Sequence, residues 1–492
     1  MLSTLPREIL LMIAAHLINP RDILNLALCT HGFYALLHHH AFTTLVLRDH
    51  DLHQLSRFTD VLARNPRCAQ AVRVLRFDPD PEPLPMREGD LTKYDRAVIL
   101  PVLEKSGFSS TAVARWENEL QDKMDIDAWI AVLLSLVHLN VEELAVTFYW
   151  PSFYVRKLLA KSFEAAEAGG GATFFPRLRE LSARWWDDEN GVPSSYILPF
   201  FRLPSLRIFN GEMIQDGRPS DADDLRKEVP LSYEEYYDER LLEEPDYETD
   251  PEGYFAHYPG DENFSNVTHI RLTYSSSEKG FPDLIRSCRS LVSFAYEHGN
   301  CASSMYLAPR RFYDSLRRHK RSLEELEICY DRWAEGWGDE LESEFIGSFG
   351  DFAALKRLRL RWENLLLPSD GEGGAVTKGA ANIPMEALPL SLESLTIEEY
   401  DKCDNPKDFM AQLRGLRSAL KSQCPDLSSL RVIVTGEDMP PQEDGWPLYS
   451  APSPGVHGTR RAAELVASTV ENISIPKGHW ECFDVSIINR EW

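Results

Sequence analysis

The stretch LEELEI, residues 323–328, shows the short apolar pattern that recurs along this chain. Its apolar residues stand at the first, fourth and sixth positions, with polar residues between them. The same spacing returns in LKRLRL at 355–360 and in LESLTI at 392–397. Alternation of this kind is typical of a short β-strand with one buried face. One copy alone means little, but copies that start 32 and 37 residues apart indicate a repeat.

The pattern recurs along nearly the whole chain of 492 residues. Further copies begin at residues 42, 72, 141, 178, 203, 267, 291 and 427, and a weaker one, VENISI, begins at residue 470. Helical patterns such as LSRFTDVLARN and DAWIAVLLSLVHL separate the copies. Two intervals, of 69 and 64 residues, are about twice the usual length. Each of them holds either a further repeat or an insertion.

This alternation of short strands and helices resembles the leucine-rich repeat family. The resemblance implies an α/β solenoid in which parallel strands line a concave wall and helices lie outside. The asparagine or cysteine that usually follows the strand is replaced here by residues such as Asp331, Glu363, Tyr400 and Thr435. We therefore expect an irregular solenoid over residues 41–492.

A different pattern opens the chain in STLPREILLMIAAHLINPRDILNLALC, residues 3–29. Five apolar residues in succession, 9–13, cover more than one face of a helix. Asp22 is positioned to cap a second helix, and CTHGFYALL predicts a third. Three helices in fewer than forty residues bury too little surface to be stable alone. We expect them to dock on the rest of the chain, on a partner, or on both.

Residues 1–40 resemble an F-box, and the layout of the whole chain resembles fungal-type F-box proteins with a C-terminal leucine-rich-repeat-like solenoid. The matching positions are Leu5, Pro6, Glu8, Ile9, Leu10, Ile13, Leu17, Asp22, Leu24, Leu26, Cys29 and Phe33. The resemblance implies binding to a Skp-family adaptor and, through it, to a cullin–RING ubiquitin ligase. The implied adaptor-binding residues are Leu5, Pro6, Ile9, Leu10, Ile13, Leu17, Leu24 and Leu26. Alternatively, these helices only cap the following domain.

Arginines are frequent at the third, fifth and seventh positions of the copies, which alternation directs to the concave wall. The candidate target-binding residues, which include two tryptophans that follow strands directly, are Arg184, Trp185, Arg207, His269, Arg271, Arg357, Arg359, Arg361 and Trp362. Because guanidinium groups bind carboxylate and phosphate at two points, the wall is predicted to receive an acidic or phosphorylated target segment. Alternatively, the arginines pair with neighbouring carboxylates such as Glu325, Glu327 and Glu363.

The net charge of −25 argues against a chain that grips nucleic acid. More than half of this charge lies in an acidic insertion, residues 212–262, with 18 acidic and 4 basic residues. The insertion either folds back over the arginine wall or is a solvated loop. Residues 368–382 and 439–459 are Pro/Gly-rich surface loops. The basic stretch RRFYDSLRRHKR, residues 310–321, is either a nuclear signal or a surface patch that binds anions. Alternatively, it is an ordinary exposed helix face.

No motif indicates an enzyme, a metal, a cofactor or a membrane span. The eight cysteines form no CxxC pair, so neither a zinc ribbon nor a disulfide framework is predicted. We expect an intracellular protein, cytoplasmic or nuclear, with reduced thiols. The leading interpretation is a substrate-recognition subunit of a Skp–cullin–F-box ubiquitin ligase, without catalytic residues of its own. The alternative is an interaction scaffold with no role in ubiquitination.

Overall fold

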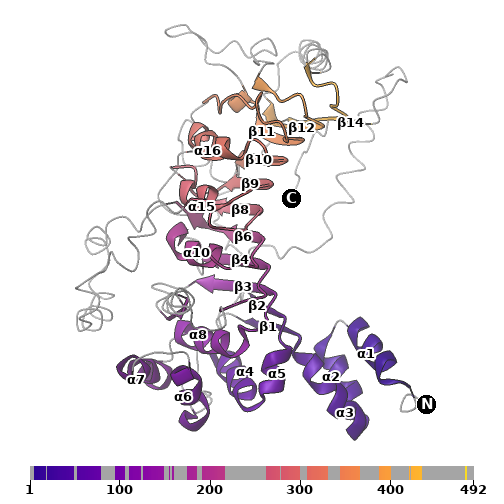
Figure 1. Ribbon diagram of the computed structural model, residues 1–492, viewed down its shortest axis with the longest axis vertical. Coiled ribbons are helices and arrows are strands. Elements are labelled where there is room, and N and C mark those ends of the chain that lie inside the picture. The colour runs from indigo at the N-terminus through magenta and orange to yellow at the C-terminus, as the bar shows by residue number, and fades with distance from the viewer. Residues whose placement is uncertain are drawn as a thin grey trace, which may run out of the picture. The chain divides into compact units, whose positions relative to one another are not determined.

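The computed structural model describes most of the repeat region and the N-terminal helices (Figure 1). The described residues are 5–17, 19–48, 52–78, 95–105, 110–123, 126–148, 154–155, 158–159, 174–185, 191–216, 262–277, 279–299, 307–330, 344–365, 387–400, 420, 423–434 and 482–484. They belong to two compact units: unit 1, residues 1–188 and 196–212, and unit 2, residues 189–195 and 213–492. Both Pro/Gly-rich loops, and the acidic insertion except for its ends, lie outside the described residues.

Unit 1 contains a row of parallel strands that follow one another in sequence order. These strands are β1 (Thr44–Arg48), β2 (Val74–Asp78), β3 (Glu143–Phe148), β4 (Glu180–Trp185) and β6 (Ile208–Glu212). A parallel pair needs a crossover connection between its strands, and helices supply most of these crossovers here. One strand from each repeat is therefore added beside the last.

Unit 2 contains a second row of parallel strands with the same sequential order. Its strands are β8 (His269–Ser275), β9 (Ser293–His298), β10 (Glu325–Tyr330), β11 (Arg357–Arg361), β12 (Ser394–Tyr400), β13 (Ser429–Val434) and β14 (Cys482–Asp484). A separate two-stranded pair joins β5 (Val192–Pro193) to β7 (Ile214–Gln215).

Helices connect the strands and precede the first of them. The α-helices are α1 (Arg7–His16), α2 (Pro20–Leu28), α3 (His31–Leu37), α4 (Leu52–Arg64), α5 (Pro66–Ala71), α6 (Arg96–Lys105), α7 (Ser110–Asn118), α8 (Ile126–Val137), α10 (Ser194–Phe201), α15 (Pro282–Ser287) and α16 (Pro309–Leu316). Single turns of other helix types are η2 (His38–Phe42), η3 (Glu119–Lys123), η4 (Arg317–His319) and η6 (Glu363–Leu365).

The apolar positions of the repeat build the core, as their alternation predicts. Leu326 and Ile328 of β10 are fully buried. Phe312 of α16 packs its ring against Phe294 and Tyr296 of β9, with ring centroids 5.9 and 4.5 Å apart. The helices of unit 2 therefore cover the strand face that carries the fourth and sixth positions, and the third and fifth positions face away from them (Figure 1).

The first of the two long intervals holds helices and no further strand of the row. Val74 of β2 lies directly opposite Glu143 of β3, so these two strands are neighbours. Between them come α6, α7, η3 and α8, and α8 is buried on nearly every face, as a helix with apolar residues all round should be. The interval is an insertion, and it thickens the core of unit 1.

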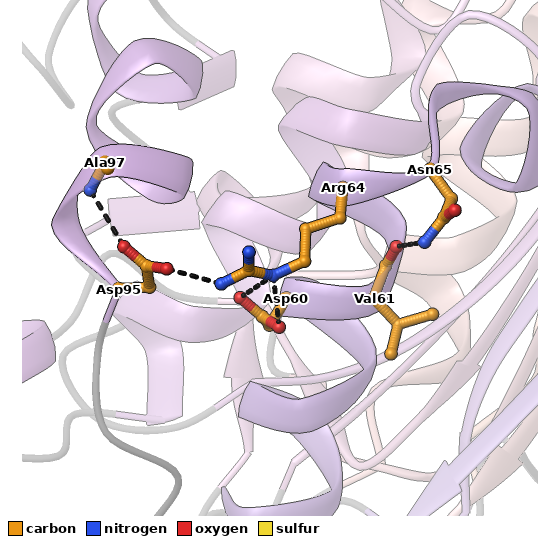
Figure 2. Close-up of polar contacts among 6 residues, drawn as sticks. All are labelled: Asp60, Val61, Arg64, Asn65, Asp95 and Ala97. Atoms are coloured by element: carbon orange, nitrogen blue, oxygen red, sulfur yellow. Dashed lines mark hydrogen bonds and ion pairs between the residues drawn. The ribbon is translucent and has the colours of Figure 1, made fainter.

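Figure 2 shows how this insertion is fastened to α4. Asp95, at the start of α6, accepts a hydrogen bond from the backbone N–H of Ala97 at 3.1 Å. Its other carboxylate oxygen pairs with Arg64, whose Nε donates to Asp60 at 2.9 Å. The hydrogen bonds to Asp60 and Asp95 raise the pKa of Arg64 above its ordinary value. One arginine thus links the last turn of α4 to the cap of α6.

Two repeat copies differ from the sequence prediction. In ten of the eleven strong copies the strand begins at the third residue of the copy. The exception is the copy predicted at 203. Its strand begins at Ile208, which lies opposite Glu180 in the parallel register, so the copy itself begins at Leu206. Leu203, buried before the strand, mimics the repeat spacing. VENISI, 470–475, lies outside the described residues, and the strand that follows β13 is Cys482–Asp484. The second long interval likewise lies mostly outside them.

Candidate functional site: an open strand face and an N-terminal helical segment

The strand face of unit 2 that points away from the helices is its first candidate site, and we name it the open face. Its third and fifth repeat positions lie side by side across the parallel register. From β8 to β13 these positions are His269, Ser293, Glu325, Arg357, Ser394 and Ser429, and then Arg271, Ala295, Glu327, Arg359, Thr396 and Arg431. The seventh positions add, among others, Glu297, Arg361 and Glu398.

Carboxylates on adjacent strands neutralise the two central arginines of the open face. Arg357 forms an ion pair with Glu325, its register partner. Arg359 donates from Nε to Glu398 at 2.8 Å and lies 3.6 Å from Glu327. Burial lowers the pKa of Arg359, but the two carboxylates outweigh burial, so the net shift is upward. The predicted arginine wall is therefore a charge-paired surface at its centre, as the alternative interpretation expected.

Two arginines and a histidine at the margins of the open face remain accessible. Arg271 on β8 and Arg431 on β13 are exposed, and within the described residues neither guanidinium forms an ion pair. His269 is exposed as well, and its Nδ1 lies 2.9 Å from the hydroxyl of Thr268. An anionic group that approaches the open face can meet Arg271 without displacing a carboxylate, whereas Arg431 lies opposite Asp484 of β14 in the parallel register.

Trp185 and Trp362 are buried, which corrects their assignment as target-binding residues. Each occupies the eighth position of its repeat, so the period of two directs it into the core. Trp186 lies outside the described residues.

Arg361 is buried too, although the seventh position should face away from the helices. It lies near a polar group made by Tyr296, His298 and Ser275. The Tyr296 hydroxyl is 2.6 Å from Nδ1 of His298 and 3.0 Å from the Ser275 carbonyl oxygen. Burial, together with the charge of Arg361, lowers the pKa of His298 to about 4. Arg361 therefore belongs to the interior and is not available to a target.

Arg207 and Arg184 of unit 1 also depart from the prediction. The corrected register puts Arg207 at the second position of its repeat, before the strand begins. Its Nη1 donates to the carbonyl oxygens of Pro204 and Leu206 at 2.9 and 2.8 Å. Ile208, which the sequence reading missed, takes the third position and is partly exposed. Arg184 is half-buried, and its buried Nε has no hydrogen-bond partner within the described residues.

The N-terminal helices, the second candidate site, form a small hydrophobic core of their own. Its buried members are Leu10, Ala14, Ile23, Ala27, Phe33, Leu37 and Ala41. The helices begin at well-formed caps: Asn19 accepts from the N–H of Arg21 at 2.9 Å, and Thr30 accepts from Phe33 at 3.1 Å. Asn19, and not Asp22, caps the second helix. Leu10 was assigned to an adaptor, but it faces this core.

The other predicted adaptor residues divide between core and surface. Leu5, Leu17 and Leu26 are half-buried against the core cluster, and Ile13 is half-buried. Pro6, Ile9 and Leu24 are exposed. The structure adds exposed apolar side chains that the resemblance did not include: Met12 at 58%, Leu28 at 70% and Tyr34 at 48%. Their exposure had no signal in the sequence, because it depends on which helix face the small core uses.

Two classes of site are not found in the described part of the chain. Its His, Cys, Asp and Glu residues form no cluster of three suited to a metal ion. The three histidines 38–40 instead make ring contacts with one another, and His38 stacks on Tyr34. No described helix has the length and apolar character needed to cross a membrane.

Comparison with known proteins gives a family match within residues 258–439. No curated protein matches the chain. One family model, described as a leucine-rich repeat domain, matches residues 258–439. This range contains β8 to β13 and therefore the whole of the open face described above. The match does not include the N-terminal helices, so their F-box resemblance stays a prediction. Residues 258–439 form a leucine-rich repeat domain, the kind of module that serves as a scaffold for protein interactions.

Proposed function

We propose that this chain is the substrate-recognition subunit of a Skp–cullin–F-box ubiquitin ligase. The N-terminal helices bind a Skp-family adaptor, and the leucine-rich repeat domain binds the target protein. One observation carries the proposal beyond a general scaffold: the N-terminal helices close a core of their own, and α1 and α2 still expose large apolar side chains, Ile9, Met12, Leu24 and Leu28. A helical segment that needed only to cap the repeats has no use for that surface.

The exposed apolar surface fits a protein partner in size and chemistry. Burying one side chain of this kind fully contributes about 1.5–3 kcal/mol. Ile9 and Met12 are three residues apart on α1, and Leu24 and Leu28 are four apart on α2, so each pair shares a helix face. Large apolar residues gathered in this way mark interaction sites on soluble proteins.

The open face of unit 2 is the proposed target site, with accessible cations at its margins. Arg271 and Arg431 favour an acidic or phosphorylated target segment, because a guanidinium can bind either group through two hydrogen bonds, and the exposed imidazole of His269 can donate one more. Arg357 and Arg359 are less suited, since a ligand would first have to displace Glu325 or Glu398. Replacing Arg271 and Arg431 with glutamate is expected to reduce target binding more than replacing Arg357.

The proposal gives the chain no catalytic residue. Ubiquitin transfer would be accelerated because the receptor holds its target close to a ubiquitin-loaded enzyme, which raises the effective concentration of the two reactants. The described cysteines are free thiols, in keeping with the cytoplasm or nucleus as the place of action. The competing function is a scaffold that does not direct ubiquitination.

Co-purification with a Skp-family adaptor tests the proposal. The variant is Met12→Asp with Leu28→Asp, because both side chains are exposed and their replacement leaves the small core intact. The matched control replaces Leu139 and Leu390 with aspartate, since they are equally apolar and lie 44% and 62% exposed elsewhere. We expect stoichiometric binding for the native chain and the control, and at least a tenfold loss for the variant.

Two results would count against the proposal. Failure of the native chain to bind an adaptor removes the F-box role and leaves the scaffold. Adaptor binding without adaptor-dependent ubiquitination of any bound protein also favours the scaffold, with the N-terminal helices as a second docking site.

A further inference from the structure

Helices α15 and α16 present an exposed basic surface on the helical side of unit 2. The two helices lie side by side in Figure 1, and Nε2 of His319, just after α16, is 3.0 Å from the carbonyl oxygen of Ile285 in α15. Their exposed cations, which we name the basic face, are Lys279, Arg286, Arg289, Arg310, Arg311, Arg317 and Arg321. Within 279–289 and 309–321 the exposed carboxylates are those of Asp283 and Asp314.

The basic face differs from the open face because its cations outnumber the described carboxylates on or beside it, among which are Asp283, Asp314 and Glu344. Among the described residues, no carboxylate forms an ion pair with Arg286, Arg311 or Arg317. The chain as a whole carries a net charge of −25, so an uncompensated group of cations is a local exception. Like charges this close repel one another, and an anionic partner would relieve that repulsion.

The acidic insertion leaves the described structure at the start of α15. Asp216, the last described residue before the gap, accepts hydrogen bonds through Oδ2 from the backbone N–H groups of Lys279 and Phe281, both at 2.9 Å. It also accepts one from the hydroxyl of Ser277. Its carboxylate therefore fixes the outgoing chain to the segment that leads into α15.

The insertion returns at the other end of α15. Glu262, the first described residue after the gap, pairs with Arg318 at 3.0 Å. Asn263 accepts through Oδ1 from Arg318 at 2.8 Å and through its carbonyl oxygen from Nε of Arg289 at 2.9 Å, while its N–H donates to the carbonyl oxygen of Arg286. The two ends are thus separated by about the length of a six-residue helix, roughly 9 Å.

We propose that the segment 217–261 binds the basic face of its own chain. These 45 residues contain fifteen acidic and four basic residues, which complements the charge of the basic face. Because both ends are held beside α15, the local concentration of carboxylates at the basic face is of the order of millimolar or more. The central arginines of the open face, which the sequence suggested as the place for this segment, already have carboxylate partners.

When the segment 217–261 is bound, it blocks the basic face to other acidic partners. An acidic protein segment in solution has to displace the tethered one, so the basic face becomes available only to a strong competitor or after removal of 217–261. The proposal is independent of adaptor binding, because it concerns unit 2 alone.

A labelled synthetic peptide of residues 217–261 tests the proposal by fluorescence anisotropy. It is titrated with the full chain and with a full-length variant in which 217–261 is replaced by a Gly/Ser linker of equal length. We expect the peptide to bind the linker variant at least tenfold more tightly than the full chain, with an affinity that falls as salt is raised.

Charge reversals locate the binding site. In the linker variant, Arg311→Glu with Arg317→Glu is expected to weaken peptide binding at least tenfold. The matched control, Arg57→Glu with Arg67→Glu in unit 1, reverses two arginines that are equally exposed and is expected to leave peptide binding unchanged. Both pairs of arginines are exposed. If the charge reversal disturbs folding, the milder variant Arg311→Gln with Arg317→Gln replaces it, and an intermediate loss of peptide affinity is expected. Equal peptide affinity for the full chain and the linker variant would overturn the proposal. So would a loss of peptide binding on Arg271→Glu with Arg431→Glu, at the open face, without a loss on Arg311→Glu with Arg317→Glu.

Discussion

Two arginines of β11, Arg357 and Arg359, stand on the same face two residues apart, yet the structure predicts different contributions to stability. The Arg357–Glu325 pair is exposed, with 52% and 32% of the side chains accessible. Arg359 is 37% accessible, and its partner Glu398 only 11%. Exposed pairs contribute about 0–1 kcal/mol, whereas a buried charge left without its partner costs about 3–5 kcal/mol.

Replacement by methionine removes each charge and keeps the apolar stem that packs on the neighbouring strands. For Arg357→Met we expect a loss of less than about 1 kcal/mol in the free energy of unfolding. For Arg359→Met we expect about 2 kcal/mol, below the full cost of a buried charge because Arg359 is partly accessible. Adding Glu398→Gln to Arg359→Met is expected to restore about 1 kcal/mol, since an amide is less costly to bury than a carboxylate.

Urea unfolding followed by tryptophan fluorescence measures these differences. With a slope of about 3 kcal/mol per molar urea, a loss of 2 kcal/mol lowers the midpoint by about 0.7 M. Equal urea midpoints for the two single variants would contradict this prediction, because they would mean that the burial of the partner carboxylate has no effect on stability. No recovery on adding Glu398→Gln would refute the part assigned to the unpaired carboxylate.

Three further predictions follow from burial and backbone geometry. Burial and Arg361 hold the pKa of His298 near 4, below its value of 6.5 in the unfolded chain, so about 3 kcal/mol of stability is lost as the pH falls from 6.5 to 4. His298→Asn should make thermal unfolding less dependent on pH in this range. An unchanged pH dependence would contradict the assignment to His298. Gly280 has φ +75°, and a β-carbon there would lie 2.6 Å from the backbone of Arg311. Gly280→Ala should therefore lower the free energy of unfolding, measured in urea, by more than about 1 kcal/mol. No loss of stability would mean that the backbone of α16 moves to make room for the methyl group. Burial raises the pKa of the Cys288 thiol to about 12, so a thiol reagent should modify exposed Cys29 in the native protein and Cys288 only on unfolding, as peptide mass mapping would reveal.

The strand positions could be read from the sequence because they depend on local periodicity. Alternation fixes which side chains point to the core, and the recurrence of the pattern fixes how many residues separate the strands. The failure at 203 has the same origin: Leu203 and Leu206 both begin acceptable copies, and only pairing between Ile208 and Glu180 selects the second. The leucine-rich repeat prediction is confirmed for residues 258–439, and the F-box resemblance remains to be tested.

The candidate site was less predictable, because it depends on what each side chain meets. The sequence treated Arg357, Arg359 and Arg361 as equivalent, but one is paired at the surface, one is paired with a nearly buried carboxylate, and one is inside. Likewise, Leu10 and Met12 belong to one apolar run, and the packing of three helices sends the first inward and leaves the second exposed.

The repeated strand–helix order, the buried positions of each repeat and the acidic character of one insertion can all be read from the amino-acid pattern. The pairing of charges, the outward-facing apolar residues of the N-terminal helices, and the start and end of the acidic insertion beside the basic face of α15 and α16 became known from the folded chain. Periodicity is local in the chain, whereas ion pairing and burial depend on residues brought together from far apart in the sequence.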